Sequence, residues 1–245
     1  MISLEGKRAL VCGGTSGIGK ATAQALRDCG SEVVILSRSA FGNNTISCDL
    51  EDLDSLTVSV NKEIESNGFF EILINNSGGP PSGPLIDAKP SDFEKAFLRH
   101  VLASQTLVQL LLPGMQKSEY GRIINIISTS VKEPIPGLGV SNTIRGAMAS
   151  WSKTLSKELP PCITINNILP GFTNTERLTE LKKTLSEQKG ISEDEVESAW
   201  LSTVPEGRLA DPSELGKVVA FLSSPAASFV RGTSIPVDGG RTGSI

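Results

Sequence analysis

The amino-acid sequence predicts an α/β protein with a doubly wound parallel sheet of about seven strands and helices on both faces. Short apolar or β-branched runs alternate with segments of helical periodicity along all 245 residues. Strands that alternate with helices form parallel sheets with right-handed crossovers. No composition break, repeat or long Pro/Gly-rich linker divides the chain, so we expect one domain over residues 1–245.

The expected elements follow one another in a regular order. The strands are short runs bounded by Gly, Pro or polar residues, at 7–12, 32–36, 45–48, 71–75, 122–127, 163–169 and 234–237. The helices have apolar residues at helical spacing, at 17–29, 53–64, 91–112, 141–159 and 212–222. Ser91 is the expected cap of the third helix, and 175–205 is expected to form two polar helical pieces.

A glycine-rich stretch separates the first strand from the first helix. Its glycines are Gly13, Gly17 and Gly19. Glycine lets the backbone approach a ligand closely, and a helix N-terminus offers free N–H groups and partial positive charge. The stretch therefore predicts a phosphate site, although an ordinary strand-to-helix turn explains the same glycines.

The bulk properties exclude several classes of protein. A net charge of −4 disfavours a nucleic-acid surface, and no run is apolar enough to be a signal peptide or a membrane span. Cys12, Cys29, Cys48 and Cys162 form no metal-binding or redox pattern, so we expect no metal and interpret them as buried thiols. Together these features favour the cytoplasm.

A series of motifs resembles the short-chain dehydrogenase/reductase family over nearly the whole chain. The glycine stretch matches its G-x-x-x-G-x-G pattern, and Asn-Asn-Ser-Gly at 75–78 is similar to its N-N-A-G. Segment 121–128 resembles the strand that ends in the active-site serine, segment 170–175 the P-G-x-x-x-T stretch beside the nicotinamide, and segment 237–240 the C-terminal signature.

The resemblance implies a Rossmann-type fold and a nicotinamide dinucleotide. Ser37 and Arg38 occupy the place where an NAD enzyme has an acid, and a guanidinium suits a 2′-phosphate, so we expect NADP(H) to be preferred and NAD(H) to be possible. Asp49 is expected to bind the adenine amino group or to cap a helix. The expected cofactor-binding residues are Gly13, Thr15, Ser16, Gly17, Ile18, Gly19, Ser37, Arg38, Asp49, Leu50, Asn76, Ser77, Gly78, Pro170, Gly171, Thr173 and Thr175.

The chain departs from the family at the catalytic residues. Ser128 matches the family's serine, but Ser141 and Arg145 stand where its Y-x-x-x-K tyrosine and lysine are expected. His100 occupies the asparagine position, and Tyr120, the chain's one tyrosine, is expected at the surface. A serine hydroxyl is a much weaker acid than a phenol, and arginine keeps its proton.

Three proton donors remain open: His100, Lys132, or a water held by Ser128 and Ser141. Each also has a structural interpretation, as a packed helix residue, a solvated loop lysine or a capping serine. Arg145 is expected to hold the nicotinamide ribose, or to bind a substrate carboxylate or phosphate together with Lys132.

The sequence thus favours an NADP(H)-dependent oxidoreductase acting on a small carbonyl or alcohol substrate. The alternative is a catalytically inactive dinucleotide-binding sensor or complex subunit. The resemblance places a substrate lid at 176–205 and implies a homotetramer or homodimer through the helices at 93–112 and 144–155. Plain core packing explains the apolar faces of these helices equally well.

Overall fold

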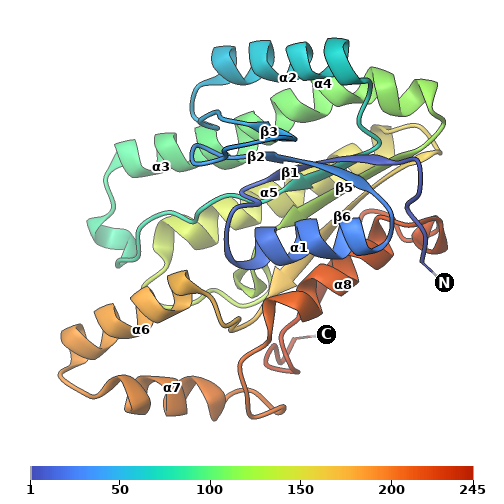
Figure 1. The fold of residues 1–245 in the computed structure, drawn as a ribbon. Coiled ribbons are helices and arrows are strands. Elements are labelled where there is room, and N and C mark those ends of the chain that lie inside the picture. The colour runs from blue at the N-terminus through green and yellow to red at the C-terminus, as the bar shows by residue number, and fades with distance from the viewer. Residues whose placement is uncertain (1, 245) are drawn as a thin grey trace.

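The computed structural model describes residues 2–244 and has one parallel sheet of seven strands (Figure 1). The strand order is β3-β2-β1-β4-β5-β6-β7, and every pair of neighbours is parallel. The chain starts at the middle of the sheet, builds outward to β3, crosses back and builds outward to β7. The expected doubly wound α/β fold is confirmed.

The strands and helices lie close to their predicted positions. The strands are β1 (Arg8–Cys12), β2 (Glu32–Leu36), β3 (Thr45–Ile46), β4 (Ile72–Asn75), β5 (Gly121–Ile126), β6 (Ile163–Pro170) and β7 (Ser234–Val237). The helices are α1 (Gly17–Asp28), α2 (Leu53–Asn67), α3 (Pro90–Phe97), α4 (Ala103–Lys117), α5 (Gly139–Glu158), α6 (Glu176–Lys189), α7 (Glu193–Leu201) and α8 (Pro212–Leu222).

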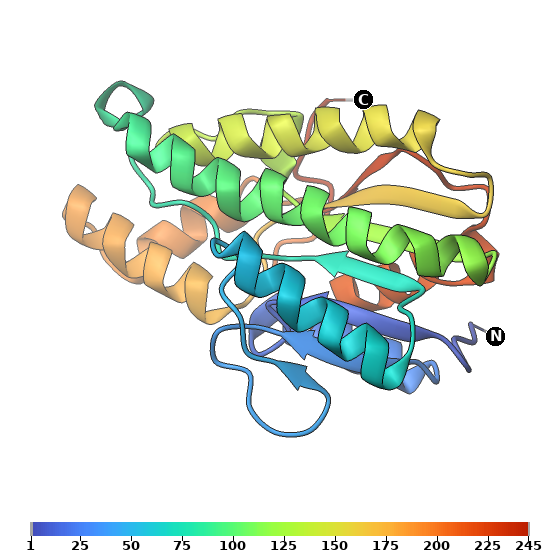
Figure 2. The same cartoon turned by 90° about the horizontal axis from the view of Figure 1, so that it is seen from above.

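Helices cover both faces of the sheet (Figures 1 and 2). On one face α2, α4 and α5 bury residues such as Leu56 and Leu107 against the strands, and on the other α1 and α8 bury Leu26 and Val219. Helices α6 and α7 project beside the carboxyl ends of the strands (Figure 1). Within residues 2–244, no helix has the length and apolar character that a membrane span requires.

The helix predicted at 91–112 differs from expectation in both its start and its interior. It begins at Pro90, and Ser91 is not its cap: the Asp92 carboxylate instead accepts the N–H of Lys89 at 3.0 Å. The π-helical turn Leu98–Leu102 joins α3 to α4. Proline is favoured in the first helical turn because its φ angle is already helical, while no periodicity reveals a single π turn.

Three smaller expectations also need correction. Tyr120 is half-buried, because its hydroxyl donates a hydrogen bond to the Ser223 carbonyl at 2.6 Å. Cys29 and Cys162 are only partly buried, whereas Cys12 and Cys48 are buried as expected.

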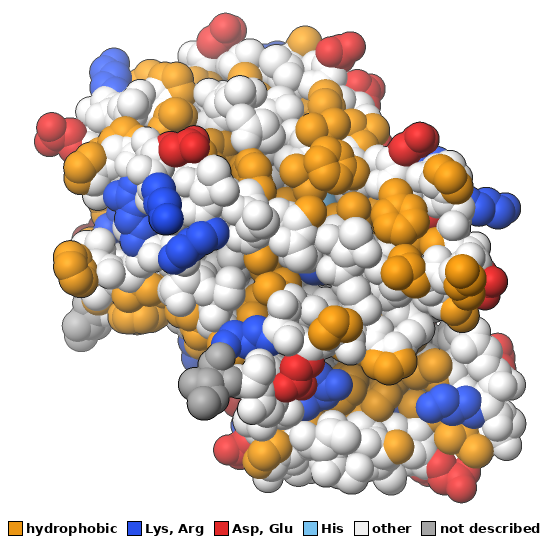
Figure 3. Space-filling model, turned by 180° about the vertical axis from the view of Figure 1, so that it is seen from behind, with side chains coloured by type: hydrophobic (Ala, Val, Ile, Leu, Met, Phe, Trp, Pro, Cys, Tyr) orange, Lys and Arg blue, Asp and Glu red, His pale blue; other side chains and the backbone are white. Residues whose placement is uncertain are grey.

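The predicted interface helices have exposed apolar side chains. Phe97 is 41% and Leu102 is 40% exposed. Figure 3 shows the face turned away from the viewer in Figure 1, where hydrophobic side chains gather in several patches. The homo-oligomer remains a prediction.

A ladder of buried amides crosses the sheet from β4 to β7. The Asn75 Nδ2 donates to Asn125 Oδ1 at 2.8 Å, the Asn125 Nδ2 to Asn167 Oδ1 at 2.8 Å, and the Asn167 Nδ2 to Ser234 Oγ at 3.0 Å. These four residues are register partners on neighbouring strands. Each Asn side chain donates to the oxygen of the next residue in the ladder, so these three donors are satisfied where water does not reach.

Replacing the middle of this ladder should destabilise the fold. Asn125 is fully buried, and Asn125→Ala leaves the Asn75 amide N–H and the Asn167 carbonyl oxygen without partners. We expect a loss of about 2–4 kcal/mol in the free energy of unfolding, measured by urea denaturation. The control is Asn43→Ala at an exposed turn position, which should change it by under about 0.5 kcal/mol. Equal values for the two variants would contradict the role of the ladder.

Candidate active site

The glycine loop between β1 and α1 is shaped so that only glycine fits. Gly13 and Gly17 have φ angles of 61° and 50°. A Cβ on Gly19 would lie 2.1 Å from the Gly13 carbonyl oxygen. The Asn76 side chain donates to the carbonyl oxygens of Cys12 and Gly13 at 3.2 and 3.3 Å, which ties the end of β4 to this loop.

The N-terminus of α1 is open to an anion. Ser16 is its N-cap residue, but the Ser16 side chain accepts no hydrogen bond from the first turn, and that turn holds no acidic residue. Free N–H groups at a helix N-terminus bind phosphate well. The interpretation of the stretch as a phosphate site therefore has geometric support.

Two clefts adjoin this loop and form one continuous groove. The first, of about 110 Å³, lies at the ends of β2 and β4 and is lined by Gly13, Leu36, Ser37, Arg38, Cys48, Asp49, Leu50, Asn76, Ser77, Gly78 and Arg99. The second, of about 490 Å³, shares six of these residues and adds Thr15, Ser16, Gly17, Ile18, Gly19, Ser39, Thr175, Glu176, Arg177 and Glu180. The groove thus contains most of the predicted cofactor residues.

The end of β2 combines hydroxyl groups with an exposed arginine. The Oγ1 of Thr15 lies 3.4 Å from Ser37 Oγ and 3.5 Å from Ser39 Oγ. The Arg38 side chain is 72% exposed and lies 3.7 Å from the Asp49 carboxylate. Asp49 does not cap α2, because Asp52 accepts the capping hydrogen bond.

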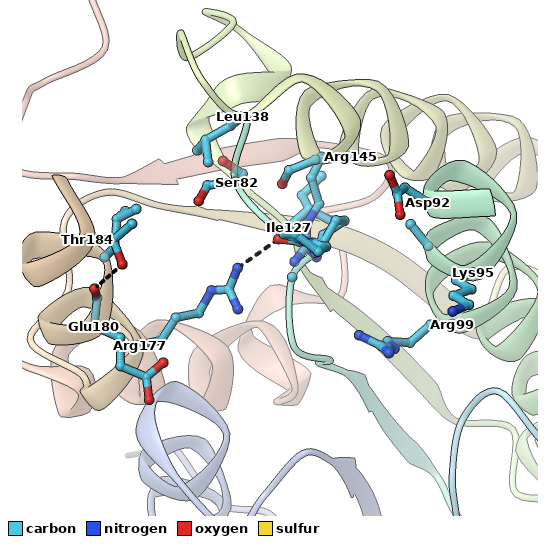
Figure 4. Close-up of a pocket in the computed structure, with 17 residues that line it drawn as sticks. Ser82, Asp92, Lys95, Arg99, Ile127, Leu138, Arg145, Arg177, Glu180 and Thr184 are labelled. Atoms are coloured by element: carbon cyan, nitrogen blue, oxygen red, sulfur yellow. Dashed lines mark hydrogen bonds between the residues drawn. The ribbon is translucent and has the colours of Figure 1, made fainter. Parts of the chain in front are cut away.

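Beyond the groove, a cavity of about 640 Å³ collects the predicted catalytic residues Ser128, Ser141 and Arg145 (Figure 4). Ser128 follows β5, and its Oγ accepts the N–H of Ser130 at 3.0 Å, so its own O–H is left to donate. The cavity is bordered by α3, α5, α6 and the Pro-rich loop at 79–82.

His100 points inward from the π-helical turn. Its Nδ1 lies 2.7 Å from Ser77 Oγ, and its buried Nε2 has no partner among the described residues. Burial, and then the charges of Arg145, Arg99 and Arg177, lower the pKa of His100 to about 2. The ring is therefore neutral at physiological pH and cannot act as an imidazolium acid.

Arg145 is a buried cation. It is 8% exposed, and its Nη1 donates to the Ile126 carbonyl at 3.0 Å. Burial, followed by the charge of Arg177, lowers the pKa of Arg145 to about 10, so the guanidinium remains charged at pH 7.

Five predicted site residues lie outside the groove and the cavity, and the buried His100 is one of them. Lys132 lines neither. The same holds for Pro170, Gly171 and Thr173, where β6 ends and a Cβ on Gly171 would lie 2.6 Å from Asp238 Cα. The roles of Lys132, Pro170, Gly171 and Thr173 remain predictions.

Sequence reasoning missed several residues that the fold adds to the site. Arg99, Arg177 and Ser39 line it. Arg99 and Ser39 neighbour the predicted residues His100 and Arg38, and Arg177 falls within the predicted lid at 176–205, so each had a signal in the sequence. Which side chain turns inward depends on the π turn and on the course of the loops.

Comparison with known proteins agrees with this geometry. A family model described as enoyl-(acyl carrier protein) reductase matches residues 13–242. The 3-oxoacyl-[acyl-carrier-protein] reductase of Haemophilus influenzae is 33% identical, with 97% of this chain and 98% of that protein covered. The NADPH-dependent reductase BacG of Bacillus subtilis is 29% identical, with 98% and 99% covered.

A solved structure supports the same assignment. L-Sorbose reductase from Gluconobacter frateurii, complexed with NADPH and L-sorbose, superposes with a TM-score of 0.92 at 25% identity, covering 100% of this chain and 99% of that one. The chain is a Rossmann-type oxidoreductase. It belongs to the short-chain dehydrogenase/reductase family.

The buried neutral His100 should make the folded state sensitive to acid. Its pKa in the folded protein lies far below its ordinary value near 6.5, so below pH 6.5 the unfolded chain binds a proton that the folded protein does not. Stability should fall by up to about 1.4 kcal/mol per pH unit as the pH decreases. His100→Gln should reduce this slope between pH 6 and 4.5, measured as the urea unfolding free energy. His100 is the chain's one histidine. An equal pH dependence of the unfolding free energy in variant and wild type would therefore contradict the lowered pKa of His100.

Proposed function

We propose that the protein is an NADP(H)-dependent oxidoreductase that transfers hydride between the nicotinamide and a small carbonyl or alcohol substrate. The main support is the arrangement of Ser128, Ser141 and Arg145 in one cavity that continues from the groove along the glycine loop. In an α/β sheet, ligands bind at the carboxyl ends of the strands, where this groove lies. Relatives named as NADPH-dependent or solved with NADPH support the cofactor.

The residues present fit a dinucleotide. The uncapped N-terminus of α1 leaves its first N–H groups free for a diphosphate, and Gly19 lets the start of the helix pack closely against the Gly13 carbonyl. We assign Asp49 and Leu50 to the adenine end, and Ser77, Gly78 and Thr175 to the part that leads toward the nicotinamide. When bound, the cofactor supplies the hydride.

Arg38 with the hydroxyls of Thr15, Ser37 and Ser39 favours NADP(H) over NAD(H). A guanidinium and hydroxyl donors match a phosphate, and no acid stands at the end of β2 to bind the two ribose hydroxyls. Asp49 lies within 3.7 Å of Arg38 but is 41% exposed, so it screens the arginine only weakly. NAD(H) remains a permitted cofactor.

We assign the role of proton donor to a water molecule held between Ser128 and Ser141. Lys132 lines neither the groove nor the cavity, and the neutral ring of His100 is bonded to Ser77. In reduction, this water would give a proton to the substrate oxygen, and the hydroxide that remains would take a proton from bulk solvent. The hydroxyls of Ser128 and Ser141 stabilise the oxygen as negative charge develops on it.

Within this proposal the chain is one catalytic domain, and α6 with α7 forms a substrate lid at 176–205. Both helices lie beside the carboxyl ends of the strands (Figure 1). The cavity is lined from α6 by Arg177, Glu180, Leu181 and Thr184. Mobile lids of this kind exclude water from the reacting groups.

Removing the serine hydroxyls should lower turnover without loss of cofactor. We expect Ser128→Ala to reduce kcat by about 100-fold and Ser141→Ala by about 10-fold, because each loses a donor at the developing oxyanion. Turnover is followed as NADPH absorbance with a carbonyl panel, and NADPH binding by fluorescence. Ser150→Ala, at an exposed position of the same α5 helix as Ser141, is the matched control.

Tight NADPH binding by the wild type without turnover of any carbonyl or alcohol would overturn the catalytic assignment. That result would favour the alternative of a dinucleotide-binding sensor or complex subunit.

Reversing the charge at residue 38 should change the cofactor preference. Arg38→Asp removes the guanidinium and adds an acid that can bind ribose hydroxyls, so the NADPH/NADH affinity ratio should fall by about 10- to 100-fold. Both dissociation constants are measured by fluorescence titration. Lys62→Asp on α2, which is exposed and lines neither cleft of the groove, should leave the ratio unchanged. An unchanged ratio for Arg38→Asp would contradict the NADP(H) assignment.

A further inference from the structure

We propose that the cavity takes a substrate with a carboxylate near its reacting carbonyl, and that Arg145 and Arg177 bind this carboxylate as a pair. The substrate class would then be a short oxo acid or the corresponding hydroxy acid. This inference rests on the proposed function, since it names the substrate of the same site.

The two guanidinium groups converge on one point. Arg145 comes from α5 and Arg177 from α6, and both extend into the cavity (Figure 4). A Cβ built on Gly79 would lie 2.8 Å from Arg177 Nη2 and 3.6 Å from Arg145 Nη2. Because residue 79 is glycine, no side chain fills the space that both cations face.

Neither charge is neutralised within the described part of the protein. Among residues 2–244, Arg145 and Arg177 form no ion pair with a carboxylate. Their hydrogen bonds go to backbone carbonyls, from Arg145 to Ile126 and from Arg177 to Pro80 at 3.1 Å. The Nε of buried Arg145 has no hydrogen-bond partner among these residues. Burying an uncompensated charge beside a like charge is costly, and an anionic ligand removes that cost.

The remaining charged groups of the cavity leave the excess positive. Arg99 is paired with Glu51, while Lys95 is in no ion pair with a described residue. Two acids also line the cavity, Asp92 and Glu180. The Asp92 carboxylate bonds to the start of α3, and Glu180 forms no ion pair with Arg177 although both lie on α6. The cations therefore remain available to a ligand.

The position of the pair beside the serines determines what the ligand carries. Ser141 precedes Arg145 by four residues on α5, so their side chains lie on the same helix face, with Cβ atoms about 5–6 Å apart. A carbonyl at Ser141 and an anionic group at Arg145 are thus separated by only a few bonds. The planar fork of arginine matches a carboxylate in two-point contact.

Arg177 also borders the groove assigned to the cofactor, so a bond to the cofactor diphosphate is the competing explanation. The two explanations differ in what removal of Arg177 changes. A diphosphate contact affects NADPH affinity, whereas a carboxylate contact affects only substrates that carry a carboxylate.

The test compares Arg177→Ala and Arg177→Lys with the control Lys183→Ala, an exposed position on the same α6 helix. The probes are 2-oxobutanoate, 3-oxobutanoate and 4-oxopentanoate, each beside its methyl ester, with NADPH. We expect wild-type kcat/KM to be at least 10-fold higher for the best acid than for its ester. Arg177→Ala should remove most of this preference by raising KM for the acid, and Arg177→Lys should restore part of it.

Binding is measured independently of turnover by calorimetry of malonate and of inorganic phosphate with the NADPH-loaded protein. We expect malonate to bind the wild type and to bind Arg177→Ala at least 10-fold more weakly, with the NADPH dissociation constant unchanged. Three results would each overturn the carboxylate pair. The first is a rise in the NADPH dissociation constant that matches the loss of activity. The others are equal kcat/KM for acid and ester, and tighter binding of phosphate than of malonate. These results would leave the proposed function intact, which fails separately if the wild type binds no NADPH.

Discussion

The amide ladder from Asn75 to Ser234 is the interaction on which the geometry of the site depends. It locks the register of β4, β5, β6 and β7 in the buried interior of the sheet, where slippage would leave several amide groups without partners. The residues that follow these strands include Asn76, Ser77 and Ser128. Because the amide ladder fixes the strand register, it also fixes the positions of these residues at the edge of the sheet.

The electrostatics of the cavity follow from a second constraint, the burial of charge. Burial and three surrounding arginines keep His100 neutral, and burial leaves Arg145 charged because its ordinary pKa is so high. In the family pattern a tyrosine and a lysine form the acidic pair. Here the corresponding positions hold a neutral hydroxyl and a permanent cation, so they supply a positive charge and only a weak acid. The chain thus keeps the family's cofactor-binding motifs but lacks its tyrosine and lysine, so the proton must come from another group.

The sheet, the helix order and the position of the groove at the strand ends could be predicted because each depends on local features of the sequence. Apolar runs, helical periodicity and the Gly13–Gly19 spacing are local properties, and parallel strands bring their carboxyl ends to one edge. The start of the helix at Pro90 was missed because serine is favoured as an N-cap residue, so Ser91 predicts a later start. The π-helical turn that carries His100 was missed because no periodicity in the sequence marks a single π turn.

The sequence by itself determined three things: the class of fold, the series of family motifs at the strand ends, and the replacement of the family's tyrosine and lysine. Only the tertiary structure decided which cations share a cavity: it leaves Lys132 outside and brings Arg177 to Arg145 above Gly79. The physical reason is that pairing between groups far apart in the chain depends on loop paths and helix packing. These are set by the whole folded chain, so no local pattern encodes them.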